Sequence, residues 1–208
     1  MKTSLLAVLL SLLPLVAVAA PTTPLVAGED YVLIDGGQPY RPLDGRIEIV
    51  EVFAYWCPHC AEFQPQLAAW ERKLPADVRF TYVPAVFDSN DAFAHGFFAA
   101  ENAGAVAKTH AAVYRAVHHD GLLAHNASFD EVAWFYGQHG LDQMQVKAAM
   151  LGPKVQGQLA AARAFALRSG IEGTPTLIVN GRYRITPHHQ GDALRIADQL
   201  IAQLRAAR

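Results

Sequence analysis

The only two cysteines of this chain lie close together, and the segment around them restricts the fold more than any other. The motif Cys57-Pro58-His59-Cys60 follows an almost unbroken apolar run over residues 47–56. Such a run is typical of a central strand that is buried on both faces and ends at an exposed turn. Apolar residues at helical spacing then predict a helix over residues 58–74, kinked by Pro65.

The remaining periodicity predicts a strand–helix–strand unit, a block of helices, a hairpin and a last helix. Strands are expected at residues 31–34, 47–55, 78–83, 176–179 and 183–185, and helices at 91–108, 109–117, 128–140, 142–150, 155–169 and 192–207. Ser128 and Glu131 form a capping box, and Asn180-Gly181 is a hairpin turn.

This order of elements is the α/β thioredoxin topology, and it predicts a thioredoxin fold with an inserted all-helical domain. The thioredoxin-like domain is expected to be discontinuous, formed by residues 27–87 and 163–208. The helical insertion would occupy residues 88–162, where alanine is abundant and β-branched residues are few.

The amino terminus indicates where the protein works. A cationic start, an apolar run over residues 5–16 and Ala17-Val18-Ala19 predict a secretory signal peptide, residues 1–19, that is cleaved after Ala19. An uncleaved membrane anchor is the alternative. Two cysteines are too few for a disulfide framework in an exported chain of this length. A net charge of −2 gives no indication of nucleic acid as a partner.

The spacing of the two cysteines indicates redox chemistry. A tetrahedral zinc site would need two more ligands, and only a histidine-completed site stays open as an alternative. If Cys57 caps the helix, Pro58 takes its first position, and the backbone N–H groups of His59 and Cys60 stabilise a thiolate at Cys57. Cys60 would then be the shielded resolving thiol. No metal, flavin or nucleotide is needed, because the redox-active disulfide Cys57–Cys60 is itself the reactive group.

Together, Cys57-Pro58-His59-Cys60, the export signal, the helical insertion and Gly173-Thr174-Pro175-Thr176 resemble the DsbA family of periplasmic thiol:disulfide oxidoreductases. The resemblance implies that Pro175 is a cis-proline facing the redox pair and that the backbone of Thr174 binds an extended client. An ordinary trans proline at an edge strand is the alternative. It also implies that His59 tunes the redox potential; a solvated histidine with little effect is the alternative.

Glu51 is the unusual residue of the central strand. It alternates in phase with Ile49 and Phe53, so its side chain is expected in the buried layer, with a raised pKa and either water or Tyr82 as hydrogen-bond partner. A surface glutamate is the alternative. The resemblance implies that an acidic residue here accepts the proton of the buried thiol. Tyr82 stands where the family has a basic partner.

The resemblance implies a periplasmic oxidase that transfers its disulfide to reduced, unfolded exported polypeptides through a mixed disulfide at Cys57. A DsbB-type membrane oxidase, linked to quinone, would reoxidise it, and the protein would be a monomer. A reductase or isomerase of the same fold stays open because Thr174 replaces an apolar residue, although little chain precedes Cys57 for a dimerisation domain. The alternative from another class is a non-catalytic peptide-binding module with a structural disulfide.

Several other residues have less specific interpretations. His118-His119 and His188-His189 are expected to be solvated rather than metal ligands. Trp56 either packs under the site or contributes to a peptide-binding surface. Three phenylalanines are expected in the core: Phe93, Phe97 and Phe98.

Overall fold

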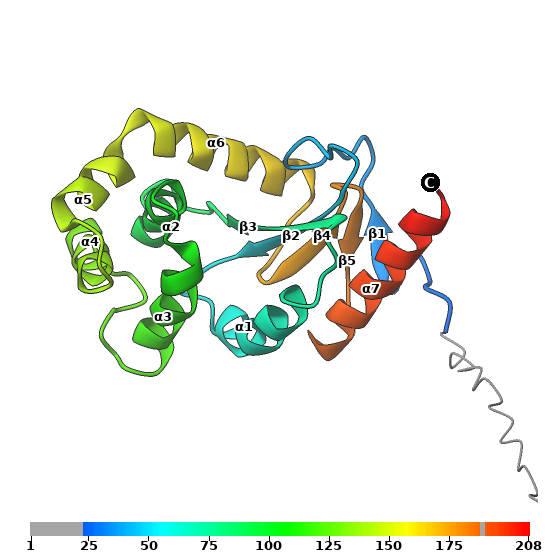
Figure 1. Ribbon diagram of the computed structural model, residues 1–208, viewed down its shortest axis with the longest axis horizontal. Coiled ribbons are helices and arrows are strands. Elements are labelled where there is room, and N and C mark those ends of the chain that lie inside the picture. The colour runs from blue at the N-terminus through cyan, green and yellow to red at the C-terminus, as the bar shows by residue number, and fades with distance from the viewer. Residues whose placement is uncertain (1–22, 188–189) are drawn as a thin grey trace, which may run out of the picture.

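One five-stranded mixed sheet runs through the centre of the protein, whose computed structural model describes residues 23–187 and 190–208 (Figure 1). The strand order is β1-β5-β4-β2-β3. The strands are β1 (Tyr31–Leu33), β2 (Ile47–Phe53), β3 (Val78–Pro84), β4 (Thr176–Val179) and β5 (Tyr183–Ile185). Only β2 and β3 are parallel, because helix α1 (Pro58–Glu71) crosses over between them. The predicted signal peptide and His188-His189 lie outside the described residues.

Strand β2 is an interior strand, between β4 and β3, and all of its residues are buried. On one face, Ile47 and Ile49 pack in one core cluster with residues of α1 and of α7 (Gln190–Ala206). On the other, Val50 and Val52 belong to a second cluster that extends into the helical block. In Figure 1, α1 and α7 lie on one side of the sheet and α6 (Pro153–Arg168) runs along the other. The apolar run before the cysteines thus is a central strand.

A block of helices separates β3 from β4. It contains α2 (Ala92–Asn102), α3 (Val106–His118), α4 (Phe129–Gln138), α5 (Gln143–Leu151) and α6. These helices gather beyond one end of the sheet, and α6 leads back to it (Figure 1). The fold is therefore the predicted thioredoxin fold with a helical insertion. Because α6 crosses residue 162 without a break, the predicted domain boundaries stay predictions.

Several element ends differ from the prediction for local reasons. The helix expected at 91–108 ends at Asn102, because Gly104 takes a positive φ of 67° before α3 begins. Helix α1 keeps Pro65 in its interior but ends at Glu71 instead of Leu74. The Ser128–Glu131 capping box is confirmed.

The hairpin between β4 and β5 is confirmed and requires its glycine. Asn180 and Gly181 have φ angles of 50° and 63°, the left-handed pair of a tight hairpin turn. A Cβ atom on Gly181 would lie 1.9 Å from the carbonyl oxygen of Gln38, so a larger residue would collide with the neighbouring loop. The Asn180 side chain also accepts a hydrogen bond from the Glu48 backbone N–H at 2.8 Å.

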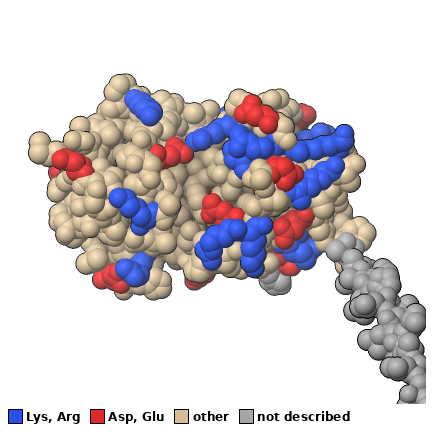
Figure 2. All heavy atoms as spheres, viewed as in Figure 1, with Lys and Arg blue, Asp and Glu red and all other residues tan. Residues whose placement is uncertain are grey.

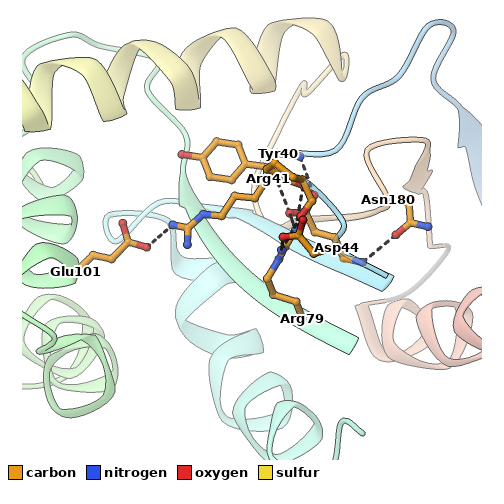
Figure 3. Close-up of polar contacts among 8 residues, drawn as sticks. Tyr40, Arg41, Asp44, Arg79, Glu101 and Asn180 are labelled. Carbon is orange, nitrogen blue, oxygen red and sulfur yellow. Dashed lines mark hydrogen bonds and ion pairs between the residues drawn. The ribbon is translucent and has the colours of Figure 1, made fainter. Parts of the chain in front are cut away.

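A buried ion pair holds the loop that precedes β2 (Figure 3). The carboxylate of Glu48 is fully buried and lies 2.7 Å from Nη2 of Arg79, its neighbour on β3. It also accepts the backbone N–H groups of Tyr40 and Arg41 at 2.7 and 3.0 Å. Arg41 in turn bonds Glu101 of α2 at 2.8 Å. The sheet, this loop and the helical block are thereby joined.

Charged side chains are unevenly distributed over the surface seen in Figure 2. In that view, lysine and arginine gather over the half that contains the sheet and α7, whereas the helical half shows only scattered charges. The surface of the helical insertion therefore offers mostly uncharged groups on this face.

Candidate active site

The redox pair lies where β2 passes into α1. Cys57 is the N-cap residue of α1, with an extended backbone (φ −81°, ψ 119°), and Pro58 follows at the start of the helix. Pro58 costs no hydrogen bond there, since the first N–H groups of a helix have no partner within it. Both cysteines are free thiols. Cys57 is 6% exposed and Cys60 is fully buried, so Cys60 is the more shielded sulfur, and the roles of attacking and resolving thiol stay predictions.

The loop before β4 brings a distant segment to Cys57. The Thr174–Pro175 peptide bond is cis, as the resemblance implies. The Cys57 thiol donates to the carbonyl oxygen of Thr174 at 3.2 Å, although the two residues are 117 positions apart. Thr174 and Pro175 therefore lie against the redox pair, where the backbone of a client could pair with them.

The pKa of Cys57 is lowered from 9.0 to about 5. The largest cause is the Cys60 thiol, which hydrogen-bonds the thiolate; partial burial opposes it, and Thr174 and the N–H groups of Cys60 and His59 assist. The predicted stabilisation by the N–H groups of His59 and Cys60 is therefore found, although the side chain of Cys57 makes no capping hydrogen bond to the helix. The two N–H groups are the smallest of these causes.

The environment of Cys60 shifts its pKa in the opposite direction. Burial raises its pKa far above the ordinary value of 9.0, and the neighbouring Cys57 sulfur and the Glu51 carboxyl raise it further. At neutral pH, Cys60 is therefore a thiol and Cys57 a thiolate. Opposed pKa shifts in two adjacent sulfurs separate their roles, since the thiolate is the nucleophile in thiol exchange.

His59 lies on the solvent side of the motif. Its Nδ1 is 3.5 Å from Oε2 of Glu62, and both side chains are 68% exposed. This is the position of a first-turn histidine at the surface, two residues after Cys57 in the chain. Its influence on the redox potential stays a prediction.

Glu51 is fully buried on β2, and both of its carboxyl oxygens are without a hydrogen-bond partner among the described residues. Burial raises its pKa well above 4.5, and Glu71 and Cys57 add to the effect, as expected from the sequence. The prediction that Tyr82 is the hydrogen-bond partner of Glu51 was wrong. Its hydroxyl donates to Oε2 of Glu71 at 2.6 Å, because α1 offers a carboxylate at the outer edge of the same layer.

Three residues of this layer were not foreseen: Tyr55, His110 and Tyr114. The Tyr55 hydroxyl is hydrogen-bonded to Nδ1 of His110 at 2.7 Å, and the ring centroids of Tyr55 and Tyr114 are 5.0 Å apart. Burial lowers the pKa of His110 to about 3, so its imidazole is neutral. The pKa of Tyr114 is raised by burial and by the nearby Glu51 and Cys60.

The signal for these residues was present in the sequence. His110, Tyr114 and His118 recur every four positions on α3, which places them on one face. His118 is half-buried, and its Nε2 lies 2.8 Å from the carbonyl oxygen of Tyr55, so the expectation of a solvated residue was wrong for it. His119, one position on, is exposed as expected. The helical insertion thus supplies one wall of the layer around Glu51.

The aromatic residues near the site divide between core and surface. Phe93, Phe97 and Phe98 are buried, as expected. Trp56 is half-buried, and its indole N–H donates to Oδ2 of Asp91 at 2.9 Å. Trp56 therefore keeps one face toward a cavity beside Cys57.

Within residues 23–187 and 190–208, no group of three or more histidine, cysteine or acidic side chains could hold a metal ion. In the same part of the chain, no helix has the length and apolar character needed to cross a membrane.

A buried thiol behind a low-pKa thiol at the start of a helix, on a thioredoxin sheet, defines a thiol:disulfide oxidoreductase. The thioredoxin family model matches residues 44–199. Over the full length of both chains, the protein is 33% identical to the thiol:disulfide interchange protein DsbA of Pseudomonas aeruginosa, covering 100% of this chain and 99% of that one. It is 38% identical to DsbA of Azotobacter vinelandii, covering 86% of this chain and 85% of that one.

The same relationship holds for solved structures. The fold is similar to the oxidoreductase DsbA from Xylella fastidiosa, with a TM-score of 0.85, 46% identity and coverage of 87% of this chain and 98% of that one. The chain belongs to the DsbA family.

Proposed function

We propose that the protein is a periplasmic disulfide oxidase whose Cys57–Cys60 disulfide is transferred to reduced, unfolded exported polypeptides. The observation that carries the proposal is the contrast between the two sulfurs. The pKa of Cys57 falls to about 5 whereas that of Cys60 rises. A stable Cys57 thiolate favours the reduced protein, which makes the disulfide a strong oxidant.

The transfer takes two exchange steps. A client thiolate attacks Cys57 of the disulfide, a mixed disulfide forms at Cys57, and Cys60 leaves and takes up a proton. A second client thiolate then attacks the client sulfur of the mixed disulfide. The client disulfide forms, and Cys57 leaves as a thiolate. Two electrons pass from the client thiols to the protein, and no other cofactor is required.

We assign to Glu51 the role of supplying the proton that Cys60 takes up. Its carboxyl is buried and raises the pKa of Cys60, and burial raises its own pKa well above 4.5. A protonated carboxyl beside a leaving thiolate can supply the proton without a charge remaining on both groups. His59 and Pro58 would set the helix start, and Thr174 and Pro175 would bind the client backbone.

The same proposal includes the export, the oligomeric state and the reoxidation of the protein. Residues 1–19 would direct export and be removed, and the mature protein would act as a monomer. A quinone-linked membrane oxidase of the DsbB type would return the disulfide after each turnover, because the transfer leaves both cysteines reduced.

The redox potential of the Cys57–Cys60 pair tests the proposal. Equilibration with reduced and oxidised glutathione should give a strongly oxidising potential, and Cys57→Ser should abolish oxidation of a reduced client while the protein stays folded. A strongly reducing potential would instead favour a reductase. A disulfide that resists reduction, or full activity of Cys57→Ser, would favour a binding module with a structural disulfide.

A further inference from the structure

A cavity of ≈ 370 Å³ opens at Trp56, the residue before Cys57, between the end of β2, the loop after β3 and the loop before α4. Two aromatic side chains line it, Trp56 and Phe87. Their ring centroids lie 6.3 Å apart with the planes tilted by 53°. Phe87 is 50% exposed, although it is a large apolar residue. An apolar surface left open next to a reactive thiol is typical of a binding site.

The same cavity has an acidic wall. Asp91 holds the Trp56 indole through Oδ2, and its Oδ1 accepts from the backbone N–H of Phe93 at 2.9 Å. Asp88 is exposed and is fixed in place by the backbone N–H of Asn90, which donates to its Oδ1 at 2.9 Å. The tryptophan is therefore held rigidly, and a carboxylate stands at the opening.

The lining of this cavity contains few basic side chains. None of the described residues that line the cavity is a lysine or an arginine. Arg163 contacts the same loop from outside the lining, at the carbonyl oxygen of Val86, 3.5 Å away. His125 is the one basic side chain in the lining. A carboxylate and two aromatic faces without a lysine or arginine are the groups that attract an organic cation.

We infer that the cavity formed by Trp56, Phe87 and Asp88 is a subsite for a lysine or arginine side chain of the client, close to its reacting cysteine. The inference rests on the proposed function, since the client must be bound at Cys57. The aliphatic stem of such a side chain packs on the two rings, and its charged end reaches the carboxylate of Asp88.

The position of the cavity sets the position of the client residue. Trp56 and Cys57 are neighbours in the chain, so their Cα atoms are about 3.8 Å apart. An extended client advances about 3.3 Å per residue, and a lysine side chain adds further reach. A basic residue one to three positions from the client cysteine can therefore enter the cavity.

The test compares peptides that differ at one position. Each has a single cysteine, with lysine, glutamine or glutamate placed one, two or three residues away on either side. The measured quantity is the rate constant for attack on the oxidised full-length protein. Because a nearby lysine also activates the peptide thiol, each rate is divided by that of the same peptide with oxidised glutathione.

At one of these positions the corrected rate with lysine should exceed that with glutamate by about three- to fivefold. The ratio of the corrected rate with lysine to that with glutamate should fall toward one in Asp88→Asn and in Phe87→Ala. Matched controls lie at β1, on the opposite edge of the sheet from β3: Asp35→Asn, also an exposed aspartate, and Leu33→Ala, whose side chain is 51% exposed. Both should keep the full preference.

Equal corrected rates for all peptides, or a lysine preference that survives Asp88→Asn and Phe87→Ala, would overturn the subsite. A preference for phenylalanine over lysine in a further peptide would assign the cavity to apolar side chains instead. These results leave the proposed function intact, whereas failure of every peptide to reduce the disulfide would contradict that function itself.

Discussion

Glu51 and Tyr82 stand opposite each other in the parallel register of β2 and β3, yet the hydroxyl of Tyr82 is bonded elsewhere, to Glu71. Three positions earlier in the same register, Glu48 faces Arg79 and forms an ion pair at 2.7 Å. Side chains alternate along a strand, so the two glutamates lie on opposite faces of the sheet. One buried carboxylate is paired with an arginine, and burial raises the pKa of the other.

Glu51→Gln should stabilise the reduced protein in neutral and alkaline solution and change little in acid. A folded-state pKa above the ordinary 4.5 means that the carboxyl's contribution to stability is complete below that pH. It is lost as the pH rises through the folded-state pKa. Glutamine cannot ionise, so its advantage should grow with pH, to about 1–3 kcal/mol in the free energy of unfolding.

Urea unfolding of both proteins at pH 4 and pH 8, with the cysteines kept reduced, measures this difference. An advantage that is the same at both pH values would show that the pKa of Glu51 does not differ between the folded and unfolded states. In the oxidation assay, the same variant should slow the step in which Cys60 is protonated, while the pKa of Cys57 changes little.

Glu48→Gln should have the opposite effect on stability. It leaves the Arg79 guanidinium, only 13% exposed, with Asp44 at 4.0 Å as its nearest carboxylate. Because glutamine keeps a single side-chain oxygen, one of the two backbone N–H groups, of Tyr40 or of Arg41, also loses its acceptor. Breaking one side of a buried ion pair costs about 3–5 kcal/mol. Glu101→Gln is the matched control, because it breaks only the more exposed pair with Arg41 and should cost less than about 1 kcal/mol. Similar losses for both variants would contradict this account.

The sequence predicts most of the fold because its signals here are local. The apolar run before Cys57, the Ser128–Glu131 capping box and the Asn180-Gly181 turn each depend on neighbouring residues, and each is found in the structure. Helix ends were less accurate, as at Asn102, since a short break at Gly104 leaves the helical period almost unchanged.

The environment of Glu51 could be predicted only in part, for a physical reason. Alternation along β2 shows that Glu51 is buried, and burial alone raises its pKa. Which polar groups approach it depends on how α1 and α3 pack on the sheet. The Tyr82 hydroxyl is hydrogen-bonded to Glu71 and the Tyr55 hydroxyl to His110. No local sequence pattern specifies these two contacts.

Titration of the Cys57 thiol should give a midpoint near pH 5, followed by thiolate absorbance or by the rate of alkylation. The largest cause is the hydrogen bond from Cys60, so Cys60→Ala should raise the pKa of Cys57, whereas Cys60→Ser keeps a donor and should raise it less. Each unit of increase lowers the thiolate fraction roughly tenfold below the midpoint. A midpoint that stays near pH 5 in both variants would assign the low pKa to the helix instead.

Thr174→Val should make the protein a weaker oxidant. The side chain of Thr174 is one of the groups that lower the pKa of Cys57, and valine keeps its shape without the hydroxyl. A less stable thiolate makes the reduced protein less stable relative to the disulfide form. The redox potential therefore moves in the reducing direction, by about 30 mV for each tenfold change in the equilibrium constant. Thr174→Ser, which retains the hydroxyl, should keep the original potential. The glutathione equilibrium of the three proteins measures this, and an unchanged or more oxidising potential in Thr174→Val would show that the hydroxyl does not stabilise the thiolate.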